Sequence, residues 1–181
     1  MRIVRRILAS LLLWASCLAA APGDALLYDL ESVWHDQAGK ETRLSSFRGT
    51  PVFLAMFYAS CTTSCPMTVN LLQRIERALP KDKSVHFVLV AFGGTADSAK
   101  RLSAFAALYQ LTASKWTLLS GRADDVRDLA AVLGVRFKST ANREIILSTG
   151  FVLVNSHGVI SDRMDDLSAD PARIIQAALV P

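Results

Sequence analysis

The sequence contains no low-complexity run, no internal repeat and no collagen-like period. Because 51% of its residues are hydrophobic, these absences exclude a chain that is disordered over most of its length. No cluster of lysines and arginines interleaved with aromatic residues occurs after the first 25 residues, so we expect no nucleic-acid partner. Cysteine is scarce as well, with three among 181 residues. The length suffices for one domain with a proper hydrophobic core.

The start of the chain resembles a secretory leader. Three arginines lie in the first six residues, and an uncharged segment, Ile7–Ala21, follows that is too short to span a bilayer comfortably. Small residues come next, so residues 1–25 are predicted to be a signal peptide, with an uncleaved membrane anchor as the alternative. Residues 26–181 then form a domain in the periplasm or cell envelope. Loss of three arginines and one aspartate lowers the net charge from +4 to +2, so the basic isoelectric point belongs largely to the leader.

Loss of the leader would also remove Cys17 and leave one cysteine pair, Cys61 and Cys65. An oxidising compartment permits a disulfide between them. A structural bridge is one interpretation, but a bridge that closes so small a loop restricts the unfolded chain little. The close spacing therefore favours a redox pair or a metal site over a structural role.

Hydrophobic runs of strand length alternate with segments of helical spacing. We predict strands at 52–58, 85–92 and 149–154, a short strand or loop at 116–121, a return strand from residue 159, and helices at 66–79, 98–109, 124–133 and 171–179. The first strand, helix and second strand form a right-handed parallel crossover, whereas Asn155-Ser156-His157-Gly158 turns an antiparallel hairpin. A mixed sheet with cysteines at its first strand-to-helix junction is the thioredoxin arrangement. The predicted fold class is therefore α/β and thioredoxin-like, with a mixed central sheet flanked by helices.

The cysteine pair lies where a buried strand passes into a helix that carries Pro66 in its first turn. Sites in such sheets gather at the carboxyl ends of parallel strands. Unpaired N–H groups and the helix dipole stabilise anions there, so a thiol ionises more readily and becomes a nucleophile and a metal ligand. Cys61 and Cys65 are therefore predicted to form a redox pair and to bind a soft ion, above all Cu(I).

Several segments resemble those of one known family, the Sco (SenC) family. Phe57-Tyr58-Ala59-Ser60-Cys61 and Cys65-Pro66 match its aromatic-then-CxxxCP segment, and Trp116–Gly121, Leu129–Phe137 and Val152–Gly158 match its later landmarks. The resemblance covers about Leu27 to Leu179. It implies a thioredoxin fold and a membrane-associated copper chaperone that serves assembly of the copper centre of cytochrome c oxidase.

The sequence departs from that family pattern in three places. Family members bind copper through both cysteines and a distal histidine, and counting back from Gly158 places Leu147 at the histidine position. Gly93-Gly94 replaces the family's Asp-Pro after the second strand. Thr62, Thr63 and Ser64 leave the CxxxC without its usual acidic residue. The resemblance therefore describes a divergent member that lacks the copper-binding histidine, and we expect Leu147 to face the pair from the start of the third strand.

Neither the three histidines of the chain nor Met67 is expected to replace that histidine as a copper ligand. We place His157 in the hairpin turn, His86 at the start of the second strand and His35 in a polar N-terminal hairpin, all far from the cysteines. The thioether of Met67 suits Cu(I), but Met67 also fits the apolar face of its helix and is predicted to be a core residue.

Two functions remain after this comparison. The first is a copper chaperone that holds Cu(I) between two thiolates and delivers it to the copper-site subunit of cytochrome c oxidase. The second is a thiol–disulfide oxidoreductase that reduces the cysteines of that subunit or of another exported thiol protein without carrying metal. A peroxidase would need a donor-rich pocket around the attacking thiol, and the sequence shows no arginine or histidine that clearly supplies one. Membrane association would follow from an uncleaved N-terminus.

Overall fold

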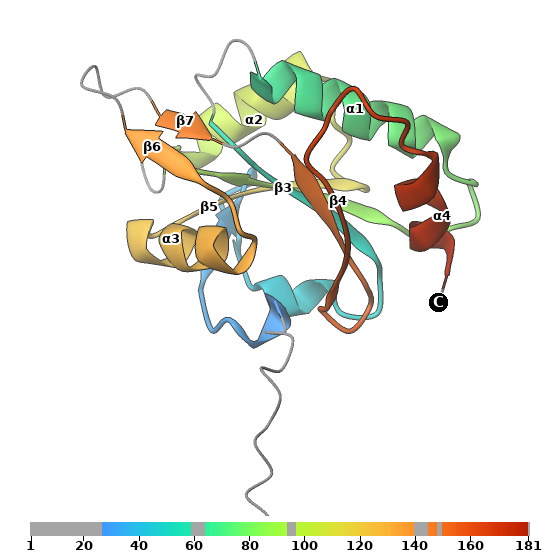
Figure 1. Cartoon of the computed structure of the whole chain (residues 1–181). Helices are drawn as coiled ribbons and strands as arrows, with labels where there is room; N and C mark the ends of the chain where they lie inside the picture. The colour runs from blue at the N-terminus through green and yellow to red at the C-terminus, as the bar shows by residue number, and fades with distance from the viewer. Residues whose placement is uncertain (1–26, 59–63, 94–96, 140–144, 148–149, 181) are drawn as a thin grey trace, which may run out of the picture.

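The computed structural model describes residues 27–58, 64–93, 97–139, 145–147 and 150–180, so the predicted leader lies outside the described residues. A seven-stranded mixed sheet has the strand order β2-β1-β5-β4-β3-β8-β9, and β6 and β7 form a separate two-stranded sheet (Figure 1). The strands are β1 (Trp34–Asp36), β2 (Glu41–Thr42), β3 (Val52–Phe57), β4 (His86–Ala91), β5 (Trp116–Gly121), β6 (Phe137–Ser139), β7 (Ile145–Leu147), β8 (Phe151–Val154) and β9 (Ile160–Met164). The helices are α1 (Ser64–Ala78), α2 (Ala99–Leu108), α3 (Ala123–Val132) and α4 (Ala172–Leu179), with 3-10 helices η1 (Leu27–Asp29) and η2 (Leu44–Phe47).

The predicted fold class, a thioredoxin-like α/β domain with a mixed central sheet flanked by helices, is confirmed. Strand β3 pairs in parallel with β4 and antiparallel with β8, and β4 pairs in parallel with β5. The predicted hairpin at 155–158 joins β8 to β9, also antiparallel. The segment 116–121, left open between strand and loop, is strand β5. No helix in the described part of the chain is long and hydrophobic enough to cross a bilayer.

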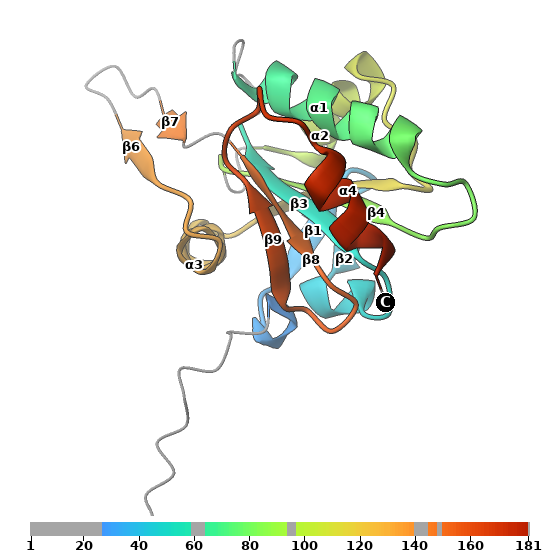
Figure 2. The same cartoon turned by 45° about the vertical axis from the view of Figure 1, so that its right-hand side comes forward.

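Two hydrophobic cores lie on opposite faces of the sheet, because side chains alternate along each buried strand. In β3, Phe53, Ala55 and Phe57 belong to the core under α1, α2 and α4. Their neighbours in the same strand, starting with Val52, belong to the core under η1, η2 and α3. Figure 2 shows α1, α2 and α4 on one side of the sheet and α3 on the other. Because β3 is buried on both faces, all of its residues are apolar.

Aromatic side chains connect the three central strands. The ring of Phe87 stacks on that of Phe53 at 5.3 Å between centroids and on that of Trp116 at 4.6 Å. The indole Nε1 of Trp116 donates a 2.8 Å hydrogen bond to Oε2 of Glu76 on α1. This bond satisfies the polar edge of a buried indole and fixes α1 against the sheet.

The predicted N-terminal hairpin is confirmed, and it extends the sheet beyond β5 through β1. Past the end of β1, the side chain of Gln37 continues the ladder. Its Nε2 donates to the carbonyl of Trp116 at 3.1 Å, and its Oε1 accepts from the N–H of Leu118 at 2.9 Å. The hairpin thus covers the edge of β5 although its strands are short and polar. Such short strands leave no hydrophobic period for sequence reasoning to detect.

The N-terminal 3-10 helix is fastened to the β8–β9 turn. The N–H of Leu27 donates to the carbonyl of Gly158 at 2.8 Å, and the ring of Tyr28 lies against Gly158. A Cβ at Gly158 would approach Tyr28 Cδ2 to 2.5 Å, and the φ of +95° also requires glycine. Burial raises the pKa of Tyr28 to about 12, against the opposing effect of Arg48. The described chain therefore begins beside the turn that follows β8.

Candidate metal and redox site

The carboxyl end of β3 leads into α1, and Cys65 is the second residue of that helix. Its side chain is buried, with 6% exposed. The sulfur accepts a 3.4 Å hydrogen bond from the N–H of Tyr58, the residue directly after β3. The predicted placement of Cys65 at a helix N-terminus is confirmed. Cys61, its predicted partner, lies outside the described residues.

The surroundings of Cys65 are apolar on the core side. Cys65 belongs to the same buried cluster as Phe57, Val69, Leu102 and Phe105, and Tyr58 packs against that cluster. Cys65 also lies at the N-terminus of α1, where the helix dipole favours an anion. The sulfur therefore lies between a dry core and the positive end of a helix. Such a position suits a thiolate that reacts or binds a soft metal at the surface.

The end of the neighbouring strand β4 carries a feature that sequence reasoning missed. The side chain of Asp97 is buried, and its Oδ2 accepts a 3.1 Å hydrogen bond from the N–H of Gly93. Burial raises the pKa of this carboxyl, while the Gly93 N–H and the charge of Arg101 oppose the increase. An acidic residue between the end of a parallel strand and the start of a helix was the available signal, because sites gather at that edge.

The three histidines lie where the sequence places them. His86 begins β4 and pairs in register with Val52, at the opposite end of the sheet from Cys65. Its Nε2 lies 2.9 Å from Thr117 Oγ1, and burial lowers its pKa. His157 is exposed in the β8–β9 turn, beyond the same end of the sheet. His35 lies on β1, with Nε2 3.7 Å from Glu41 Oε1. None of them contributes to the site at the end of β3.

The prediction that Met67 is a core residue is wrong. Its side chain is 55% exposed, although it lies two residues after Cys65 in the first turn of α1. Residues two apart on a helix point in nearly opposite directions, so burial of Cys65 turns Met67 outward. The hydrophobic spacing that suggested burial is satisfied instead by Val69, Leu72 and Ile75. The same geometry separates the thioether of Met67 from the sulfur of Cys65.

The expected position of Leu147 at the start of the third long strand is also wrong. Leu147 ends β7 and pairs with Phe137 of β6 in a separate two-stranded sheet. The long strand β8 begins only at Phe151. The predicted third strand, 149–154, was thus correct in place, but an additional short hairpin precedes it. The polar residues between 138 and 144 hide that hairpin from a periodicity analysis.

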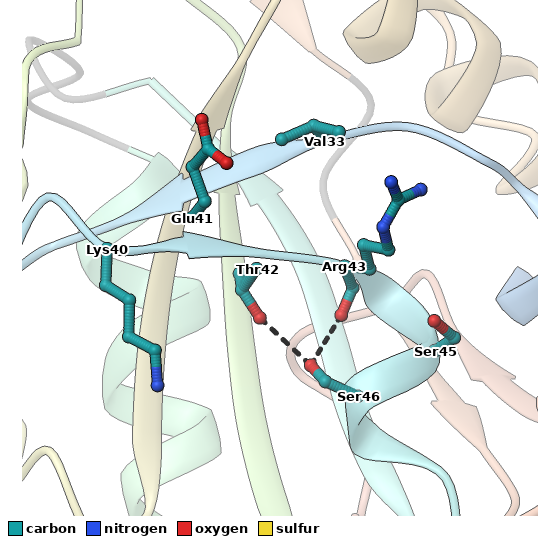
Figure 3. Close-up of a pocket in the computed structure, with 7 residues that line it drawn as sticks. All are labelled: Val33, Lys40, Glu41, Thr42, Arg43, Ser45 and Ser46. Carbon is teal, nitrogen blue, oxygen red and sulfur yellow. Dashed lines mark hydrogen bonds between the residues drawn. The ribbon is translucent and has the colours of Figure 1, made fainter.

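A surface pocket of about 470 Å³ lies at the β2–β1 edge of the sheet. In the strand order, β5 and β4 separate this edge from β3. Figure 3 shows the lining residues, with Ser46 between Thr42 and the carbonyl of Arg43 at 2.9 and 2.6 Å. No cysteine or histidine lines the cavity, so it adds nothing to thiol chemistry. Among the described residues, no group of three or more His, Cys, Asp or Glu side chains could hold a metal ion.

Solved structures with the same fold include proteins of the family suggested by the sequence. A SCO1/SenC family lipoprotein from Bacillus anthracis str. Ames is 22% identical over 84% of this chain and 94% of that one, with a TM-score of 0.75. Bradyrhizobium japonicum ScoI with copper bound is 17% identical over 81% and 94%, with a TM-score of 0.69. BsSco, described as a member of the Sco family of cytochrome c oxidase assembly proteins with a disulfide switch, is 24% identical over 84% and 92%, with a TM-score of 0.69.

Likeness at these identities establishes the fold, and the family follows from a separate comparison. A search among curated proteins gave no match. The family model for SCO1/SenC matches residues 31–179, which include β3, the start of α1 and the segment that carries Leu147. This range also agrees with the extent of the resemblance recognised in the sequence. The chain therefore belongs to the SCO1/SenC family.

Proposed function

We propose that this protein binds Cu(I) through Cys61 and Cys65 and delivers it to the copper-site subunit of a respiratory oxidase. The observation that carries the proposal is the position of Cys65 at the N-terminus of α1, with its sulfur at the end of a buried parallel strand. Family membership supports it, as does the copper bound to the related ScoI from Bradyrhizobium japonicum. The description of BsSco as an oxidase assembly protein supports the proposed client.

Two thiolates are sufficient ligands for Cu(I), because this soft ion accepts low coordination numbers and prefers sulfur. The helix N-terminus compensates part of the negative charge that two thiolates bring together. Metal binding displaces the thiol protons, so copper loading releases protons and weakens as the pH falls. A site of this kind needs no histidine, which agrees with leucine at position 147.

A Cu(I) titration of the reduced protein under anaerobic conditions tests this proposal. We expect about one Cu(I) per chain to be retained against a weak colorimetric chelator. Thiol alkylation of the unprocessed chain, followed by peptide mass spectrometry, should show that copper protects Cys61 and Cys65 together and leaves Cys17 reactive. Retention of no copper by fully reduced protein would contradict the proposal.

A second function, thiol–disulfide exchange without metal, is favoured by the missing histidine. In this reaction one thiolate of the pair attacks a client disulfide, and the second thiol then displaces the client's sulfur. The pair becomes a disulfide and the client a dithiol. The disulfide switch described for BsSco supports this alternative. If the reduced protein binds no Cu(I) but its pair still exchanges with a test disulfide, the second function replaces the first.

We also propose that residues 1–25 form a secretory signal and that residues 26–181 act as one domain in the cell envelope. The short uncharged run after three arginines supports the signal, and the related lipoprotein from Bacillus anthracis supports an envelope location. Intact-mass spectrometry of the exported protein should find a mature N-terminus near residue 21 or 26. A protein that starts at Met1 in the membrane fraction would instead establish an uncleaved anchor.

A further inference from the structure

Strand β9 forms one border of the seven-stranded sheet. It pairs with β8 on one side, and the described part of the chain places no strand on its other side (Figure 2). The opposite border, β2, has two residues, whereas β9 has five. A free strand edge presents N–H and C=O groups to any other strand that can pair with them. The outer edge of β9 is therefore the longer of the two places where a second chain can add a strand to this sheet.

Arg163 lies within β9, and side chains bind both of its backbone polar groups. Its N–H donates to Oδ1 of Asp162 at 2.6 Å, and its carbonyl accepts from Nη2 of Arg173 at 3.1 Å. Arg163 is in register with Val152 of β8, and alternate residues of an antiparallel strand direct their backbone groups to opposite sides. A residue of β9 whose N–H and C=O are held by side chains thus faces the free edge. These side chains occupy the backbone groups that an added strand would need.

The two side chains also bind each other. Nη1 of Arg173, in the first turn of α4, donates to both carboxylate oxygens of Asp162 at 2.5 and 2.6 Å. The side chain of Asp162 is 9% exposed, and no other acid in the ion pairs of the described residues is less than 22% exposed. Exposed ion pairs contribute little, whereas a buried carboxylate depends on its cation and on its hydrogen bonds. The Asp162–Arg173 pair is therefore held in one arrangement at the edge of the sheet.

We propose that the Asp162–Arg173 pair keeps the outer edge of β9 from pairing with β9 of a second copy of this chain. A two-fold axis brings two such edges together antiparallel, because each copy supplies the same backbone groups. With the pair in place, the N–H and C=O of Arg163 already have partners. An added strand has to break these bonds and leave the carboxylate of Asp162 without its cation. The sheet thus ends at β9 and the chain stays monomeric.

The substitution Asp162→Ala tests this inference, because it frees the N–H of Arg163 and removes the anchor of the Arg173 side chain. Sedimentation velocity of the exported protein is measured over a range of concentrations, with reductant present to prevent intermolecular disulfides. We expect a monomeric wild type, and for Asp162→Ala a dimer whose dissociation constant is at least about tenfold below the limit set by wild type. Arg173→Ala frees only the carbonyl and should give a smaller increase. Asp124→Ala breaks the exposed Asp124–Arg127 pair on α3 and should behave as wild type.

Hydrogen exchange shows where the two copies meet. In Asp162→Ala, the amides of β9 should exchange more slowly as the protein concentration rises, because a second strand then covers them. In the wild-type protein, the exchange of β9 should not depend on concentration. Circular dichroism establishes that each variant is folded. If Asp162→Ala does not fold, Arg173→Ala carries the same test, because it removes an exposed side chain and keeps the carboxylate.

Three results would overturn the inference. In the first, the folded edge variants stay as monomeric as Asp124→Ala. In the second, a dimer forms but the amides of β9 gain no protection. In the third, the wild-type protein already pairs through β9 with the ion pair intact. The assay uses neither copper nor a client protein, so its outcome is independent of the function proposed above.

Discussion

Replacement of Cys65 by alanine is expected to lower the affinity for Cu(I) by about 100-fold or more. A two-coordinate thiolate site loses half of its ligands with this change. Mutation of a residue that only hydrogen-bonds a metal ligand already lowers metal affinity or activity by about 10–100-fold. Cys61→Ala should have an effect of similar size. The measurement is competition with a Cu(I) chelator under anaerobic conditions, with the free-thiol count taken in parallel.

Two control variants separate loss of a ligand from general damage. Cys17→Ala removes a thiol from the predicted leader and should leave the affinity unchanged. Met67→Leu removes the exposed thioether near Cys65 while keeping a similar shape, and we expect less than a twofold change because the thioether points away from the sulfur. A large loss in Met67→Leu would show that this thioether is a copper ligand. Unaltered affinity in both Cys61→Ala and Cys65→Ala would show that copper binds elsewhere on the chain.

The central strands of this fold are predictable from sequence because their residues are buried on both faces. The continuous apolar run of β3 has the length of a buried strand, and the end of that strand gives the place of Cys65 at the next junction. The hairpins β1–β2 and β6–β7 behave differently. Their strands have two or three residues each, which is too short for a hydrophobic period to be recognised in the sequence, so pairing with a neighbouring strand decides their conformation.

The parts of the site that escaped prediction depend on packing that a sequence pattern does not contain. Met67 satisfies the helical spacing of α1 almost as well as Val69, and only the orientation of the helix on the sheet decides which one is buried. Asp97 has no neighbour in sequence that signals burial. Its burial accompanies the hydrogen bond that its carboxylate accepts from the N–H of Gly93. Fold and thiol position were therefore accessible from the sequence, whereas the groups that surround the thiol were not.

Leu147 stands where the family pattern has a copper-binding histidine, and this difference is expected to decide which oxidation state of copper the protein holds. The wild-type protein should hold Cu(I) but not Cu(II), since Cu(II) prefers additional nitrogen ligands in a tetragonal arrangement. Added Cu(II) should instead oxidise the pair, so that two Cu(II) become two Cu(I) while the two thiols form one disulfide and release two protons. We expect no stable absorption band from sulfur-to-Cu(II) charge transfer. A stable band in the wild-type protein would mean that another side chain already completes the site.

The substitution Leu147→His supplies an imidazole at the position that the family pattern assigns to a copper ligand. Leu147 ends β7, in the hairpin that precedes β8, and β8 pairs directly with β3. The variant is expected to retain Cu(II) with a charge-transfer band that Cys61→Ala or Cys65→Ala abolishes. Ile146→His is the matched control, because it places the same imidazole at the neighbouring position, which the family pattern does not assign to a copper ligand. Equal bands in both variants would argue for nonspecific binding, and no band in Leu147→His would mean that this strand does not reach the cysteines. A band in Leu147→His alone would show that one imidazole separates this chain from a Cu(II)-binding protein, because the thiolates and the scaffold that positions them are already in place.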